Sequence, residues 1–276
     1  MTGSRIRTAR LAAGLSLRET ARRAHIDAGY LSQIEHGHRA ASPKVLAALS
    51  DVLGAELEQP APLRAALELL TSNAPAVVVA DQHAVHELRL LDDQVGGIDS
   101  YPIVAGVLAD VDAPATYAEV AQVAGWVAAD AGRPETARQH YVQGTQAAAE
   151  SGNRVAGANC LSSLAYLLAG SNDAVLLAQA AANVRDLPAT MAALTAERLA
   201  WTLARAGDAG RCFQALDAAD DAWTRREPEA EPAATYWLSE SEMQTMRGRC
   251  YVALHRPLRA VPLLETITAE YAWSIR

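Results

Sequence analysis

The sequence predicts an all-α protein, with a small helical head followed by a longer array of helical hairpins. Residues 16–37 alternate capping and apolar positions in the manner of two short helices joined by a tight turn. From about residue 114 a small residue recurs at the centre of four helical stretches, at offsets of 40, 35 and 48 residues. The strand-like run 77–79 has no partner strand elsewhere, so we expect it to be helical as well.

The head contains the most informative pattern of the chain. Ser16 can cap a first helix by accepting a hydrogen bond from an amide of its first turn, and Leu17 and Ala21 supply an inward apolar stripe. Asp27 can cap a second helix, which Gly37 is placed to end in a left-handed conformation. Two helices joined by so short a turn cross steeply and leave the second one exposed. The pattern therefore predicts a helix that can enter the major groove of DNA.

These residues resemble the helix-turn-helix of the phage-repressor or Xre family, from Ile6 to about Leu57. In that family the position matching Arg10 pairs with the one matching Glu35, which ties the first helix to the recognition helix. His25 departs from the pattern, because the family usually has a glycine in the turn and histidine enters the left-handed region at some cost. A helical pair with no DNA role is the alternative. The match rests on Ile6, Arg10, Leu11, Gly14, Leu15, Ala21, Leu31, Ser32, Ile34, Glu35, Gly37, Ser42, Pro43, Leu46, Leu49 and Leu53.

The resemblance implies a DNA-binding domain over residues 1–58 with two kinds of DNA contact. On the recognition helix, Gln33 can bond to adenine through both of its amide atoms, whereas Ala28 and Gly29 offer only apolar or backbone contact. Basic side chains at helix ends and in the following loop suit phosphates. The predicted DNA-binding residues are Arg7, Arg18, Ala28, Gly29, Ser32, Gln33, His36, Arg39 and Lys44.

Charge is distributed unevenly along the chain. The net charge is −8, yet residues 1–58 carry eight Lys or Arg and six Asp or Glu, a net +2. The remaining residues carry sixteen basic and twenty-six acidic side chains, a net −10. Only the first part therefore suits a polyanion, because the rest would repel phosphates.

Other classes of function find no support in the sequence. Cys160, Cys212 and Cys250 are far apart without a CxxC spacing, which favours buried reduced thiols in a cytoplasmic protein. The sequence has no phosphate-binding loop, GxSxG or HExxH motif, and no apolar run that could span a membrane. We therefore expect no enzyme, no catalytic residues, no metal site and no cofactor. His83 and His86 could hold a metal, but a solvated polar face is favoured.

Behind the head, the sequence predicts a connector over residues 59–113, with helices at 62–70, 77–91 and 98–111. The repeat region follows over residues 114–276. Its central small residues are Gly125, Ala165, Ala200 and Gly248, and its expected turn residues, seven positions later, are Gly132, Asn172, Gly207 and His255. This region resembles a degenerate tetratricopeptide array, with a generic alanine-rich bundle as the alternative. A last helix beginning at residue 271 would be cut off, so we expect a truncation or a partner that covers this end.

In tetratricopeptide folds the concave groove is lined by the residue after the central small one and by those three and six before it. Aromatic, amide and charged side chains occupy these positions here and suit a peptide or a flat small molecule. The aromatic rings can equally pack between hairpins, and both interpretations stay open. The predicted ligand-binding residues are Gln122, Trp126, Asn159, Tyr166, Glu197, Trp201, Arg205 and Arg249.

Together these features predict a homodimeric, sequence-specific transcriptional regulator with an array that serves as sensor or dimerisation domain. Its partners would be a double-stranded DNA operator and a small peptide or metabolite effector. The arrangement resembles bacterial regulators that respond to such molecules. The alternative is a protein-interaction adaptor or antitoxin-like protein that binds DNA for autoregulation.

Overall fold

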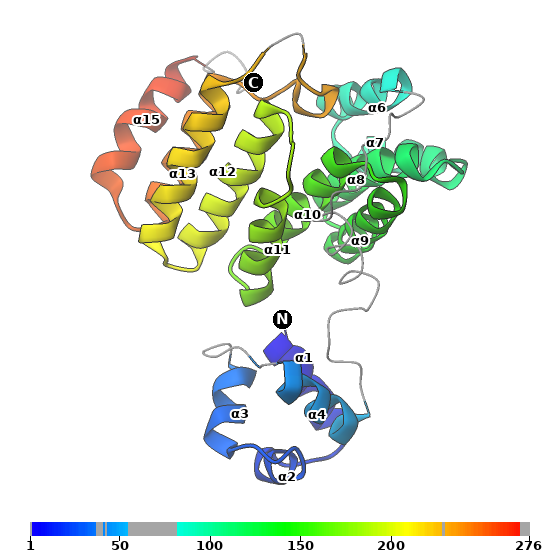
Figure 1. Ribbon diagram of the computed structural model, residues 1–276, viewed down its shortest axis with the longest axis vertical. Helices are drawn as coiled ribbons and strands as arrows, with labels where there is room; N and C mark the ends of the chain where they lie inside the picture. The colour runs from blue at the N-terminus through cyan, green and yellow to red at the C-terminus, as the bar shows by residue number, and fades with distance from the viewer. Residues whose placement is uncertain (1, 37–40, 42, 55–81, 228–229, 271–276) are drawn as a thin grey trace. The chain divides into compact units, whose positions relative to one another are not determined.

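The structure is a computed structural model that describes residues 2–36, 41, 43–54, 82–227 and 230–270. Every regular element in these ranges is helical, as the sequence predicts. The helices form two compact units, one built around α1 to α4 and the other around α6 to α15 (Figure 1). None of the described helices is both long enough and apolar enough to cross a membrane.

The first unit has short helices whose starts follow from the predicted caps. The Ser16 hydroxyl accepts a hydrogen bond from the Glu19 amide at 3.2 Å, and the Asp27 carboxylate accepts one from the Tyr30 amide at 2.9 Å. His25 takes the left-handed conformation with φ 53°, so the histidine fills the position where the family usually has glycine. The helices are α1 (Thr2–Ala12), α2 (Leu17–Arg23), α3 (Ala28–Glu35) and α4 (Pro43–Leu53).

The described core of this unit is small and includes an ion pair. Ile6, Leu31 and Leu49 are fully buried where α1, α3 and α4 meet. Beside them the Arg10 guanidinium donates to both carboxylate oxygens of Glu35, at 2.7 and 2.8 Å. The expected link between the first helix and the recognition helix is thus confirmed.

The second unit is a succession of helical hairpins. The four predicted repeats are the pairs α8–α9, α10–α11, α12–α13 and α14–α15, and Figure 1 shows α12 and α13 side by side. The bounds are α6 (Gln82–Val95), α7 (Gly97–Ala109), α8 (Pro114–Asp130), α9 (Pro134–Ser151), α10 (Arg154–Leu167), α11 (Asn172–Ala182), α12 (Ala189–Arg205), α13 (Ala209–Thr224), the 3₁₀ turn η2 (Ala233–Thr235), α14 (Glu240–Ala253) and α15 (Pro257–Glu270).

The central small residues lie where two helices cross closely. A Cβ atom on Gly125 would collide with the Tyr141 ring of α9, and one on Gly248 would lie 2.8 Å from a Leu264 methyl group of α15. Ala165 and Ala200 occupy the same place in the middle repeats and are fully buried. Small side chains at these positions therefore allow the two helices of each hairpin to pack tightly.

The predicted turn residues are correct in three repeats. Gly132, Gly207 and His255 have φ of 73°, 79° and 55°. In the second repeat the left-handed residue is Gly170, with φ 100°, and Asn172 instead begins α11. The turn of this repeat comes two residues earlier than the fixed offset predicts, because α10 ends two residues after its central Ala165, whereas α8 and α12 end five residues after Gly125 and Ala200.

The described part of the predicted connector packs as a further hairpin against the array. Val85 of α6 and Val104 of α7 are buried in one cluster with Val120 of α8. The turn between α6 and α7 is made by Gly96, with φ 74°. The predicted helix at 62–70, the start of the one at 77–91 and the helix beginning at 271 lie outside the described residues.

Candidate functional site

The first unit exposes one face of α3. Gly29 and Gln33 are exposed and Ala28 and Ser32 are half-buried, while Leu31 on the opposite face is in the core. The Gln33 side chain makes no hydrogen bond among the described residues, so its amide is available for contact. The exposed His36 ring lies at the end of the helix, with Nδ1 2.8 Å from the Ser32 carbonyl oxygen.

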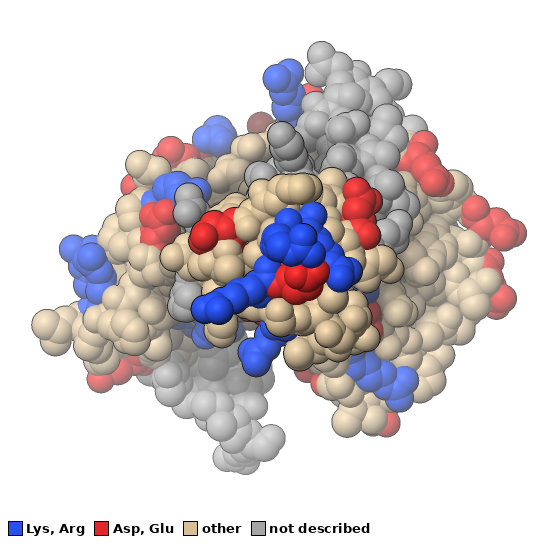
Figure 2. All heavy atoms as spheres, turned by 90° about the horizontal axis from the view of Figure 1, so that it is seen from below, with Lys and Arg blue, Asp and Glu red and all other residues tan. Residues whose placement is uncertain are grey.

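Arginine side chains gather around a carboxylate on the face of this unit drawn in Figure 2. On α2, Glu19 accepts hydrogen bonds from Arg22 at 2.6 Å and from Arg23 at 2.7 Å, which lower the pKa of Glu19 to about 2. Arg18 on the same helix and Arg7 on α1 are exposed. Arg39 and the side chain of Lys44 lie outside the described residues.

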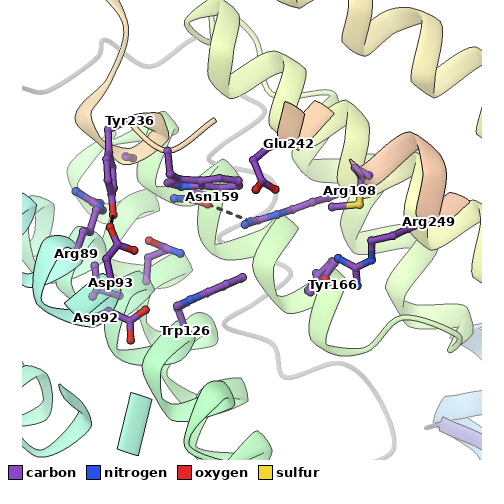
Figure 3. Close-up of a pocket in the computed structure, with 15 residues that line it drawn as sticks. Arg89, Asp92, Asp93, Trp126, Asn159, Tyr166, Arg198, Tyr236, Glu242 and Arg249 are labelled. Atoms are coloured by element: carbon purple, nitrogen blue, oxygen red, sulfur yellow. Dashed lines mark hydrogen bonds between the residues drawn. The ribbon is translucent and has the colours of Figure 1, made fainter. Parts of the chain in front are cut away.

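The second unit contains a cavity of about 470 Å³ (Figure 3). The cavity draws on the first helix of every repeat, on α6, and on the segment around η2. Its lining is a mixture of aromatic, amide and charged side chains. The lining residues are Arg89, Asp92, Asp93, Gln122, Val123, Trp126, Asn159, Tyr166, Arg198, Ala234, Tyr236, Trp237, Glu242, Met246 and Arg249.

The structure brings five of the eight predicted ligand-binding residues to this cavity, namely Gln122, Trp126, Asn159, Tyr166 and Arg249. The other three, Glu197, Trp201 and Arg205, are not part of its lining.

The aromatic rings combine the two roles that the sequence left open. The rings of Trp126 and Tyr166 stack with centroids 6.4 Å apart, and Tyr166 lies 6.3 Å from Trp201. Trp126 nevertheless keeps 40% of its surface exposed. The row therefore joins successive hairpins and also offers an apolar wall to the cavity.

Arg198 is the most deeply buried charge of the cavity, with 3% of its surface exposed. Its Nη1 atom donates to Asn159, Ser162 and Ser163, at 3.2, 3.0 and 2.7 Å. All three acceptors are neutral, and Arg198 has no ion pair among the described residues. Burial lowers the pKa of the guanidinium for the same reason, since nothing of opposite charge compensates the lost water.

Acidic side chains lie at another side of the cavity. Asp92 and Asp93 lie in the last turn of α6, and the Tyr236 hydroxyl donates a hydrogen bond to the Asp93 carboxylate. Burial raises the pKa of Asp92, and the nearby Asp130 and Asp93 charges raise it further. The neighbouring Arg89 does not neutralise this pair, because its guanidinium donates to Glu119 at 2.6 Å.

Glu197 lies outside the cavity, with 2% of its surface exposed and one carboxyl oxygen without a hydrogen-bond partner. Burial raises its pKa to about 9, and Asp220 and Glu242 add to the shift while Arg247 opposes it. The carboxyl is therefore protonated at neutral pH.

Sequence reasoning missed Arg198 by one position. The residue three before the central Ala200 is Glu197, but the residue that reaches the cavity is two before it. Val123 and Met246, two before Gly125 and Gly248, also line the cavity. In three of the four repeats, the residue two positions before the central small one thus lines the cavity. Tyr236 and Trp237 carried no comparable signal, because they lie in the irregular link before α14.

No His, Cys, Asp or Glu residues in the described ranges form a group of three or more that could hold a metal ion. The three cysteines are buried and free, as the sequence predicts.

Residues 6–59 match the family model described as Helix-turn-helix. This part of the chain is a helix-turn-helix domain. The match agrees with the predicted resemblance to the Xre family over nearly the same residues. A crystal structure of Bacillus thuringiensis PlcR in complex with the peptide PapR7 and DNA is similar to the chain, with 11% identity and a TM-score of 0.47 over 98% of this chain and 94% of that one. The search of curated proteins returned no match.

Within the helix-turn-helix domain, α2 and α3 are the paired helices and α3 is the recognition helix. Its capping residue Asp27 and its two core residues Leu31 and Ile34 fix the helix on the unit. The face that carries Gly29 and Gln33 is consequently directed away from the core.

Proposed function

We propose that this chain is a transcriptional regulator that binds a double-stranded DNA operator as a homodimer and responds to a small effector. The observation that carries the proposal is the joining, in one chain, of a helix-turn-helix domain and a lined cavity in a helical array. The cavity of about 470 Å³ falls within the range of roughly 300–1,000 Å³ that holds small-molecule ligands. The effector is a small peptide or a metabolite.

On the DNA side, α3 enters the major groove and Gln33 bonds to an adenine through both of its amide atoms. Arg7, Arg18, Arg39 and Lys44 contact phosphates, and Ala28 and Gly29 allow close approach to the bases. Ser32 and His36 complete the contact surface. Two copies reading half-sites about 34 Å apart give the operator its twofold symmetry.

On the effector side, the molecule in the cavity must bind the DNA-competent and DNA-incompetent forms with different affinity, since otherwise it shifts no equilibrium. The cavity draws on the first helices of all four repeats, so a bound molecule contacts several hairpins at once. Such contacts can change how the hairpins are arranged, and with them the spacing of two DNA-binding domains.

Selection of bound DNA from a random pool by the full chain tests the DNA side. We expect an enriched sequence with two related half-sites. Gln33→Ala should then relax the preference at one position in each half-site by roughly 1–3 kcal/mol, because the bond to adenine is lost. A pool that shows no enrichment would contradict the proposal.

The matched control is Arg18→Gln, which removes a charge without touching the face that reads bases. It should weaken binding to all sequences alike and reduce the slope of log affinity against log salt by about one.

Purification of the full chain tests the alternative function, a protein-interaction adaptor. A stoichiometric protein partner in place of a small molecule would favour an adaptor.

A further inference from the structure

The cavity presents unpaired charges of both signs. Arg198 and Arg249 lie toward one side of it and Asp92 and Asp93 toward another, with Trp126 between them (Figure 3). Arg89 also lines the cavity but pairs with Glu119, so the unpaired charges of the lining are Arg198 and Arg249 on one side and the three carboxylates Asp92, Asp93 and Glu242. A molecule that matches both sides therefore carries a negative and a positive group.

Arg198 carries the argument for the negative end of such a molecule. A buried guanidinium is stable only when hydrogen bonds and a counter-charge replace its water. Of the three guanidinium nitrogens of Arg198, Nη1 donates the printed hydrogen bonds, and Nε and Nη2 make none among the described residues. Arg198 lines the cavity with these two donors unused, and two donors on one planar group can bind a carboxylate in bidentate fashion.

Arg249 adds a second cation on the same side. Its guanidinium carbon lies 5.6 Å from the Tyr166 ring centre and 4.8 Å from that of Trp201, and Arg198 lies 6.0 Å from the same Tyr166 ring. Arg249 has no ion pair among the described residues. The aromatic rings hold both guanidinium groups in place without neutralising them.

The opposite side suits a cation. Asp92 and Asp93 are adjacent in α6, and Asp93 has the Tyr236 hydroxyl as its only hydrogen-bond partner in the described chain. Asp92 accepts a hydrogen bond from Ser100 at 3.2 Å, which is also a neutral group. Glu242 projects from α14 toward the space between the two sides and can accept hydrogen bonds from a ligand's N–H groups.

We propose that the effector is a zwitterion, with a carboxylate bound by Arg198 and Arg249, an ammonium group bound by Asp92 and Asp93, and an apolar or aromatic body against Trp126. This inference rests on the proposed function, because it names the chemical class of the molecule that the regulator senses. Free amino acids with large side chains and short unblocked peptides have this chemistry.

The test uses the full chain and a set of free amino acids and dipeptides of the standard residues. Binding is measured by the shift in melting temperature and by tryptophan fluorescence, since Trp126 and Trp237 line the cavity. Each binder is then compared with its C-terminal amide and its N-acetyl form, which remove one charge and keep the body. We expect each blocked form to bind about ten- to a hundredfold more weakly, the range for hydrogen bonds between charged groups.

Variants locate the two ends. Arg249→Gln should weaken binding of the unblocked probe about tenfold but leave binding of its C-terminal amide nearly unchanged. Asp92→Asn should likewise weaken binding of the unblocked probe and leave binding of its N-acetyl form nearly unchanged. Arg198→Met should weaken binding of the unblocked probe more than Arg249→Gln does. If Arg198→Met fails to fold, Arg249→Gln still tests the carboxylate end. The matched controls are Arg256→Gln, which alters an exposed arginine over the Phe213 ring, and Asp217→Asn on α13.

Two results of the binding measurements would overturn the inference. One is that no amino acid or dipeptide binds, and the other is that blocked and unblocked forms bind equally well. The proposed function is judged separately by DNA titration. A zwitterion that binds in the cavity without changing DNA affinity would support the ligand class and contradict the regulatory role. An effector that changes DNA affinity and carries only one charge would support the regulatory role and contradict the proposed ligand class.

Discussion

The helix-turn-helix domain and the hairpin array both contain buried arginines, and Arg10 of the domain and Arg198 of the array differ in how their charge is compensated. Arg10 meets the Glu35 carboxylate through two hydrogen bonds, so the domain neutralises its interior charge with its own side chains. Arg198 is more deeply buried, yet its partners are an amide and two hydroxyls.

We interpret the difference as one of role: Arg10 stabilises the fold, whereas Arg198 is placed to bind a ligand. The internal ion pair completes the packing of α1 against α3, and the remaining terminal nitrogen of Arg10, Nη1, donates to the Leu15 carbonyl oxygen. An interior guanidinium with open donors beside a cavity is costly to keep unless something binds there. The pairing of a buried charge is thus a better guide to its role than the depth of its burial.

The largest expected effect comes from breaking the internal pair. Glu35→Gln leaves the Arg10 charge buried without its counter-charge and should destabilise the helix-turn-helix domain by about 3–5 kcal/mol. Chemical denaturation followed by far-ultraviolet circular dichroism measures the loss. Glu19→Gln is the control, because Glu19 pairs with arginines on the surface and its replacement should leave the transition nearly unchanged. Equal effects of the two changes would contradict the structural role of the pair.

A second prediction concerns pH. The raised pKa of Glu197 means that the unfolded chain loses a proton above about pH 4.5 that the folded array keeps up to about pH 9. The stability contributed by this carboxyl is therefore complete below pH 4.5 and falls as the pH rises toward 9, by about 1.4 kcal/mol per pH unit at most. Glu197→Gln should remove that dependence. Melting curves at pH 5 and 8 check it, and a variant whose loss of stability from pH 5 to 8 equals that of the parent would contradict it.

Replacing Arg198 should destabilise the array less than replacing Arg10 destabilises the helix-turn-helix domain. Arg198→Met loses hydrogen bonds to three neutral groups but also removes an uncompensated buried charge, so stability should stay within about 2 kcal/mol of the parent. Arg10→Met leaves Glu35 buried alone and should cost about 3–5 kcal/mol. The two variants are compared in the same denaturation experiment. A reversed order would mean that Arg198 is a structural group.

The smallest effect is expected in the aromatic row. Trp201→Ala removes the contact with Tyr166 and the surface beneath Arg249, which together should reduce stability by about 1–2 kcal/mol. Because Trp201 does not line the cavity, the affinity for a bound zwitterion should fall only severalfold. Trp126→Ala should instead weaken binding strongly with a similar change in melting temperature. Identical binding losses in the two variants would contradict the assignment of the cavity wall.

The sequence predicted the elements better than it predicted which side chains face the cavity. Ser16, Asp27 and the Arg10–Glu35 pair follow from local spacing, because capping and pairing act over a few residues or at fixed family positions. The crossing points at Gly125 and Gly248 follow from side-chain size alone. All of these could therefore be predicted from the order of residues.

The rotation of each helix about its own axis could not. Adjacent residues on a helix point about 100° apart, so choosing Glu197 over Arg198 required knowing how α12 is turned against its neighbours. The acidic side of the cavity depends on a contact between Asp93 and Tyr236, 143 residues apart, with no local pattern to reveal it. Tertiary packing alone brings such residues together.

That contact also has a consequence for how the array unfolds. Repeat arrays are quasi-linear, because each repeat touches only its neighbours and either end can fray alone. Here η2, which precedes the last hairpin, packs against α6 ahead of the first repeat, and Tyr236 bonds to Asp93 across that join. Fraying at α6 must therefore also release the segment before α14. The early and late parts of the unit are coupled in this way, and we expect them to melt in a single cooperative transition.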